Sequence, residues 1–165
     1  MAGDWPEPVE RVAAVLRSNG IEGRVEEFRS GTPTAEAAAE AAGCGLEQIV
    51  KSLLFALDGG ERYALVMVPG DRRADRAKIA AELGVGKAKP ASPQEVLDVT
   101  GFDVGGVAPF PAGRVEASLL DRTLVTHEVV WVGAGSPRHM AVLAPADLAR
   151  LTRARVVDAV SDTTT

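Results

Sequence analysis

One lysine lies inside an apolar run, and its position makes it the first candidate for chemistry. Lys51 belongs to residues 49–57, which are otherwise aliphatic or aromatic apart from Ser52. If the run is a strand, Lys51 shares a face with Leu53 and Phe55, where an unpaired ammonium is costly to bury. This placement predicts a lysine at the mouth of a cavity that receives an anionic group. The alternative is a lysine at the start of a strand, with its stem packed and its amine in water.

Two glycine-rich segments could bring backbone amides close to a ligand. Gly105 and Gly106 form one pair, while Gly133 and Gly135 precede Ser136 in the other. Glycine has no Cβ, so a ligand can approach its N–H closely, and a pair of such amides can stabilise an oxyanion. Taken individually, each glycine is better explained as part of an ordinary turn.

The sequence matches no complete motif for nucleotide or metal binding. Lys51 and Ser52 resemble the end of a phosphate loop, but Val50 occupies the position of the second glycine. Arg138 stands where a dinucleotide fingerprint needs its third glycine. The two histidines and one cysteine have no recognised metal-ligand spacing. We therefore expect neither a metal nor a cofactor.

Side-chain nucleophiles are weakly indicated. Cys44 lies between two glycines, a setting more typical of a small buried cysteine than of a nucleophile. The sequence has no G-x-S-x-G motif. A pairing of Ser136 with His139 is weak, because the two flank an expected turn and no third partner is evident.

Length and composition predict one globular domain over residues 1–160, followed by a polar, disordered tail over residues 161–165. The net charge of −5 argues against broad wrapping of nucleic acid, although a small basic patch could still grip one end. No apolar stretch is long enough to span a membrane, and no signal peptide is recognisable. With a single cysteine, the expected location is the cytoplasm.

Local patterns predict interleaved helices and strands. The Ser92-Pro93-Gln94-Glu95 segment carries an N-cap serine and a capping-box glutamate, and Thr34 can cap an alanine-rich helix. Strands are expected at residues 25–28, 49–57, 62–68, 114–119, 128–132 and 140–143. This order favours a mixed sheet over a doubly wound parallel one.

Taken in order, several segments resemble the YbaK/prolyl-tRNA synthetase-associated domain family. The resemblance runs from about residue 9 to residue 157 and is specific only in combination. It is carried by residues 34–38, 48–55, 66–73, 100–102, 105–109, 120–121, 133–137 and 145–148.

This resemblance implies an α/β (α+β) fold, with a mixed, partly barrel-like β-sheet surrounded by helices. It also implies hydrolysis of a mischarged aminoacyl-tRNA, commonly proline tRNA, by water and the substrate's own groups. The family's invariant lysine matches Lys51, and its glycine–proline loop matches residues 105–109. Ala108 departs from the serine that often precedes the proline of that loop.

The resemblance supplies the remaining site residues except His139, which is chosen because it follows the turn at residues 133–137 near the start of an expected strand. The catalytic set is Lys51, Gly105, Gly106 and Asp121, and the substrate-binding set is Thr34, Phe55, Gly101, Pro109, Gly133, Gly135, Ser136 and His139. Asp121 is expected to order a loop by hydrogen bonds rather than to act as a base. His139 is proposed as a size sieve, against the favoured alternative of a histidine at a strand end.

The leading functional prediction is a free-standing trans-editing aminoacyl-tRNA deacylase acting on proline tRNA that carries a wrong small amino acid. Its partners would be the acceptor end of aminoacyl-tRNA and a prolyl-tRNA synthetase, without a membrane. The alternative is a catalytically inactive module that binds a nucleotide-like ligand or a protein. A serine or cysteine hydrolase of small molecules ranks third.

Overall fold

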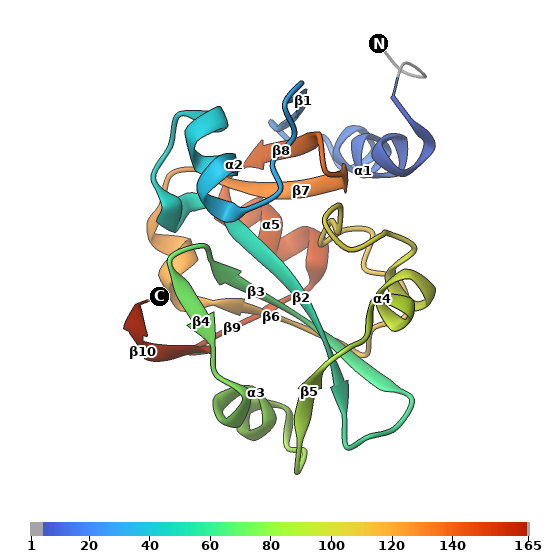
Figure 1. The fold of residues 1–165 in the computed structure, drawn as a ribbon, viewed down its shortest axis with the longest axis vertical. Helices are drawn as coiled ribbons and strands as arrows, with labels where there is room; N and C mark the ends of the chain where they lie inside the picture. The colour runs from blue at the N-terminus through green and yellow to red at the C-terminus, as the bar shows by residue number, and fades with distance from the viewer. Residues whose placement is uncertain (1–4, 165) are drawn as a thin grey trace.

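The computed structural model describes residues 5–164. They form five α-helices and ten strands, and the strands are arranged in three sheets (Figure 1). The largest sheet has the strand order β5-β2-β3-β6-β9. Its central hairpin pairs β2 (Val50–Leu57) antiparallel with β3 (Arg62–Pro69), and the sequence predicted both strands within one residue of these bounds. The outer strands are β5 (Ala88–Pro90), antiparallel to β2, and β6 (Ala117–Asp121) and β9 (Arg155–Val157), which run parallel to β3.

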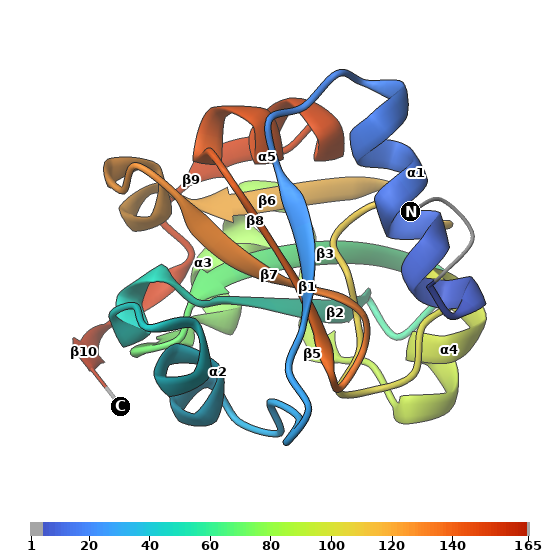
Figure 2. The ribbon, with the colours of Figure 1, turned by 90° about the horizontal axis from the view of Figure 1, so that it is seen from above.

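A second, antiparallel sheet has the order β1-β8-β7 and crosses over β2 (Figure 2). Its strands are β1 (Arg24–Glu27), β7 (Val130–Ser136) and β8 (His139–Leu143). An isolated bridge between Ile49 and Trp131 connects it to the large sheet. A short third sheet pairs β4 (Arg72–Ala74) with β10 (Val160–Thr164).

Three of the described α-helices begin at a side-chain cap, supplied by Thr34, Asp75 and Ser92. Thr34 Oγ accepts the Ala37 amide at 3.0 Å, and Ser92 and Glu95 form the predicted capping box. The helices are α1 (Glu7–Ser18), α2 (Ala35–Ala42), α3 (Arg76–Leu83), α4 (Pro93–Thr100) and α5 (Pro145–Thr152), with 3₁₀ turns η1 (Leu46–Gln48) and η2 (Arg122–Thr126). Among the described residues, none of these helices has the length and apolar character that crossing a bilayer requires.

The main core fills the space between the two larger sheets. Val50 and Met67 from the β2–β3 hairpin pack in one cluster with Val132 and Leu143 from the β7–β8 hairpin. A second cluster lies under α3, where Ile79 packs with side chains from the other face of the five-stranded sheet. Because these two clusters pack against opposite faces of β2, its run is apolar apart from Lys51 and Ser52. The mixed, helix-covered sheet is the architecture that the sequence predicted.

Two expectations differ from the structure. Residues 161–164, expected in a disordered tail, belong to β10, because backbone pairing with β4 orders them; Thr165 lies outside the described residues. Residues 133–136, expected in a glycine-rich loop, belong to β7. There the ladder with β8 continues through a register shift between Gly133 and Ser136.

Candidate active site

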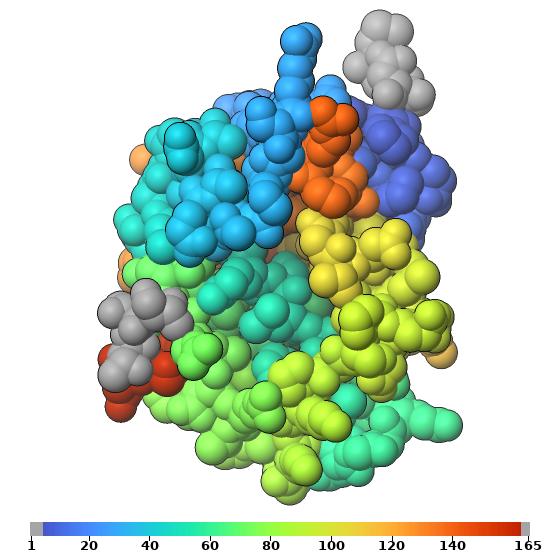
Figure 3. Space-filling view, in the orientation of Figure 1, coloured from blue at the N-terminus to red at the C-terminus, as the bar shows by residue number. Residues whose placement is uncertain are grey.

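A pocket of about 550 Å³ lies against β2, and residues 49–55 form one of its walls. The other walls come from the segments leading into α2 and α4, the loop after α4, and the β7–β8 hairpin. In Figure 3, β2 is visible at the bottom of a hollow surrounded by these segments. The predicted site residues that line the pocket are Thr34, Lys51, Phe55, Gly105, Gly133, Ser136 and His139.

Lys51 is half-buried on β2 and its amine is held in place. Its Nζ donates a hydrogen bond to the Arg72 carbonyl at 2.6 Å, which uses one of its three N–H donors. Burial lowers the pKa of Lys51, while the nearby Glu36 and Asp71 carboxylates act against that shift and Arg73 adds to it. The lysine is therefore a partly desolvated cation at the pocket wall, suited to an anionic or polar ligand group.

The glycines of the 104–107 loop and β7 mainly allow two backbones to pack closely. A Cβ at Gly106 would lie 2.8 Å from the Ser136 Cα, and one at Gly133 would lie 2.5 Å from the Val107 carbonyl oxygen. The Gly135 amide donates to the Gly106 carbonyl at 3.0 Å. These contacts seat the loop on β7, so that Gly105 and Gly133 reach the pocket through their backbone.

Ser136 and His139 meet at the tip of the β7–β8 hairpin. Ser136 Oγ lies 2.6 Å from His139 Nδ1 and also accepts the Arg138 amide at 3.0 Å. His139 is only 5% exposed, and burial lowers the pKa of its ring, with Glu27 opposing and Arg138 assisting the shift. The sequence analysis gave this pair little weight, because the two residues flank an expected turn and no third partner is evident. Residue types alone do not show that the two side chains face each other across the turn.

Five predicted residues do not line the pocket. Gly106 and Gly135 pack against backbone, and Gly101 ends α4 with φ +78° while its carbonyl accepts Arg11 at 2.7 Å. Pro109 is buried. Asp121 is fully buried: its carboxylate accepts the Thr123 amide at 3.0 Å and the Ala159 amide at 2.8 Å. These bonds order the chain after β6, and they place Asp121 away from the pocket wall, although it was expected in the catalytic set.

Sequence reasoning missed Ser52. The Ser52 side chain lines the pocket, and its hydroxyl is buried. Among the described residues this hydroxyl has no hydrogen-bond partner. A buried polar group without a partner is costly, and this one is placed to be satisfied by a ligand or a water. The only available signal was that it follows Lys51 directly in the chain.

The other candidate groups are not placed for catalysis at this pocket. Cys44 does not line it, and burial together with the Glu47 carboxylate raises the pKa of its thiol, which disfavours the thiolate. Within residues 5–164, no cluster of three or more His, Cys, Asp or Glu side chains could hold a metal ion.

Comparisons with known proteins agree on one family. Residues 29–151 match the model of the aminoacyl-tRNA editing domain. The chain is 35% identical to the uncharacterised protein YwhH of Bacillus subtilis, over 82% of this chain and 85% of that protein. It is 27% identical to the multifunctional Ser/Thr-tRNA deacylase ProXp-y of Escherichia coli, over 90% of each chain.

Longer relatives and solved structures extend this agreement. The proline–tRNA ligase of Lactobacillus johnsonii is 31% identical over 53% of this chain, which corresponds to 15% of the ligase. A crystal structure of a protein proposed to be a trans-editing enzyme for prolyl tRNA synthetase superposes with a TM-score of 0.87. That protein is 34% identical, and the match covers 96% of this chain and 99% of the other. The chain therefore belongs to the aminoacyl-tRNA editing domain family, and it is an aminoacyl-tRNA deacylase, a hydrolase of ester bonds.

Proposed function

We propose that this protein acts in trans on proline tRNA carrying a wrong small amino acid and hydrolyses the aminoacyl ester. The observation that carries the proposal is the half-buried Lys51, held at the wall of a pocket otherwise lined largely by apolar side chains and glycine backbone. The similarity to a protein proposed to edit for prolyl tRNA synthetase supports the choice of proline tRNA.

The proposed reaction needs no side-chain nucleophile. Water adds to the ester carbonyl carbon, the bond to the ribose oxygen breaks, and that oxygen leaves with a proton. Lys51 binds the phosphate or ribose of the terminal adenosine, while the backbone at Gly105 and Gly133 approaches the reacting ester. The Gly106 amide is not assigned to the oxyanion, because it already donates to the Asp103 carbonyl at 3.0 Å.

A covalent mechanism is the second candidate, favoured by the contact between Ser136 and His139. In that mechanism Ser136 Oγ attacks the ester carbonyl and His139 takes its proton. We rank it lower, because the same hydroxyl also accepts the Arg138 amide and closes the hairpin turn.

The amino acid itself has two leading candidates. A pocket discriminates one methylene by only about 1–3 kcal/mol, so alanine and serine are both compatible with a pocket of this size. The deacylase activity of the Escherichia coli relative towards Ser/Thr-tRNA adds threonine to the set to be tested.

The test is a deacylation screen with alanyl, seryl, threonyl and cysteinyl groups, each on proline tRNA and on its own tRNA. We expect the highest kcat/KM for one of these groups on proline tRNA, and loss of that activity in Lys51→Ala. Equal rates on both tRNAs would contradict the proline assignment. Binding without turnover for every substrate would instead establish the alternative, an inactive binding module.

Two further parts of the proposal concern the setting. The reaction is proposed to occur in the cytoplasm, where aminoacyl-tRNA is used. A complex with a prolyl-tRNA synthetase is proposed as the route by which mischarged tRNA reaches the pocket. Co-sedimentation of the two purified proteins, with and without tRNA, tests this route, and sedimentation as separate species under both conditions would contradict it.

A further inference from the structure

We propose that the C-terminal strand β10 is a positioning element for Lys51, acting through the Arg72 carbonyl. This inference rests on the proposed function, because it treats Lys51 as the residue that binds substrate. It adds a set of residues remote from the pocket that decide where the lysine amine lies.

The first step is the bond between Lys51 and Arg72. A lysine amine sits on a flexible four-carbon stem, so the backbone of β2 alone does not fix its position. The 2.6 Å hydrogen bond from Lys51 Nζ to the Arg72 carbonyl supplies the missing restraint. The position of the amine therefore depends on the position of β4.

The second step is the dependence of β4 on β10. The strand β4 has three residues, and its ladder partner is β10, with Ala74 opposite Val160 and Arg72 opposite Thr164. The Arg72 guanidinium also donates to the Ser161 carbonyl. Such a short strand is stable only when paired, so β10 holds the carbonyl that holds Lys51.

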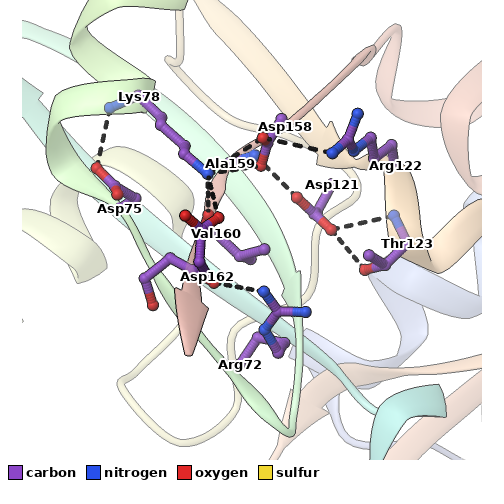
Figure 4. A network of polar contacts seen from close by, with 11 residues as sticks. Arg72, Asp75, Lys78, Asp121, Arg122, Thr123, Asp158, Ala159, Val160 and Asp162 are labelled. Atoms are coloured by element: carbon purple, nitrogen blue, oxygen red, sulfur yellow. Dashed lines mark hydrogen bonds and ion pairs between the residues drawn. The ribbon is translucent and has the colours of Figure 1, made fainter. Parts of the chain in front are cut away.

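The third step is the anchoring of β10 by a polar network (Figure 4). Lys78 Nζ on α3 donates to the Val160 carbonyl at 2.7 Å and forms an ion pair with Asp158 at 3.1 Å. The Ala159 carbonyl accepts the Asp75 amide at 2.8 Å, and the Ala159 amide donates to the buried Asp121 carboxylate, also at 2.8 Å. This network gives the buried Asp121 a role outside the pocket.

The position of β10 in the chain makes the dependence notable. The family match ends at residue 151, whereas β10 spans Val160–Thr164. A residue inside the matched region, Lys51, is thus held through a segment that lies outside it.

The experiment uses the full-length protein with Arg72→Met and, separately, Lys78→Met. Arg62→Met is the matched control, because it also removes a basic side chain that makes a polar contact, in this case with the exposed Glu116. Reductive methylation followed by mass spectrometry gives the reactivity of Lys51 relative to Lys87, which is exposed in the same chain. Deacylation assays on the same variants give kcat and KM separately.

In Arg72→Met and in Lys78→Met we expect Lys51 to react about threefold faster. Either change weakens the attachment of β10, so the β4–β10 pair opens more often and frees the Lys51 amine. We expect kcat to fall about tenfold with a smaller change in KM, because a misplaced group mainly affects the reacting geometry. Arg62→Met should change neither quantity.

Two outcomes would overturn the inference. One is wild-type Lys51 reactivity together with wild-type kcat in both Arg72→Met and Lys78→Met, when both variants are folded. The other is an effect confined to Arg72→Met and to KM, which would make the guanidinium a direct RNA contact. The reactivity of Lys51 can be measured without turnover. If the wild-type protein were inactive, that result would count against the proposed function, and the Lys51 reactivities of the variants would still decide the β10 inference.

Discussion

Ser136 and His139 face each other across the turn formed by Pro137 and Arg138, with Ser136 Oγ 2.6 Å from His139 Nδ1. Burial lowers the pKa of His139, which favours the neutral ring, and in the tautomer that carries its proton on Nε2 the Nδ1 atom accepts the Ser136 hydroxyl. The Trp5 ring packs edge-on against the imidazole, with ring centroids 5.4 Å apart. These contacts hold the imidazole in one orientation at the pocket wall.

Despite this contact, we predict that Ser136→Ala retains deacylase activity within about tenfold of wild type, because water is the proposed nucleophile. Cys44→Ala should behave in the same way, since Cys44 does not line the pocket. Single-turnover assays with each folded variant provide the measurement. A loss of about a thousandfold in either one would establish covalent catalysis instead.

Lys51→Ala should lower kcat/KM by about 100-fold, because it removes the half-buried cation that binds the substrate end. The thermal unfolding midpoint should change little, since within residues 5–164 the lysine amine makes a single hydrogen bond, to the Arg72 carbonyl. Lys87→Ala, at an exposed lysine that does not line the pocket, is the control and should retain wild-type activity. Full turnover by Lys51→Ala would remove the lysine from the site.

Gly106→Ala should destabilise the fold by about 1–3 kcal/mol, because its Cβ would lie 2.8 Å from the Ser136 Cα. Gly60→Ala is a matched control in the β2–β3 turn, where the nearest atom to an added Cβ is 3.8 Å away. Urea unfolding of both variants provides the comparison. Equal stabilities would show that the 104–107 loop is not seated on β7 as described. A larger Gly106→Val substitution should also reduce activity, by displacing Gly105 from the pocket.

His139→Ala should broaden the range of accepted amino acids more than it lowers the rate with the preferred one, if the imidazole limits the size of the pocket. Deacylation of a small and a large aminoacyl group should be measured side by side. His127→Ala, a histidine that does not line the pocket, should leave the ratio of the two rates unchanged. Equal effects of His139→Ala on both substrates would leave His139 with only a structural role.

Ser52→Ala should lower kcat/KM by about tenfold while leaving stability unchanged or slightly higher. The hydroxyl it removes is buried without a partner among the described residues, so its loss costs the folded protein nothing. In the complex it is proposed to hydrogen-bond the substrate or the attacking water. Activity assays paired with urea unfolding separate the two effects, and unchanged activity would exclude Ser52 from the site.

Local features of this protein were predictable from sequence because they depend on neighbours a few residues away. The Thr34 cap, the capping box at Ser92 and the β2–β3 hairpin all follow from side chains and turn residues adjacent in the chain. Lys51 was predictable for a related reason, since a charge inside an apolar run breaks a local pattern. The structure places Lys51 at the pocket wall, and its part in catalysis stays a prediction.

Tertiary structure alone decided the features that join distant segments. Whether a glycine faces the ligand or another backbone depends on what packs against it, and Gly106 meets Ser136 from another part of the chain. The ordering of β10 likewise comes from Arg72 and Lys78, which lie more than 80 residues earlier. A contact between such segments forms only when the whole core has assembled, so no local pattern of residue types records it.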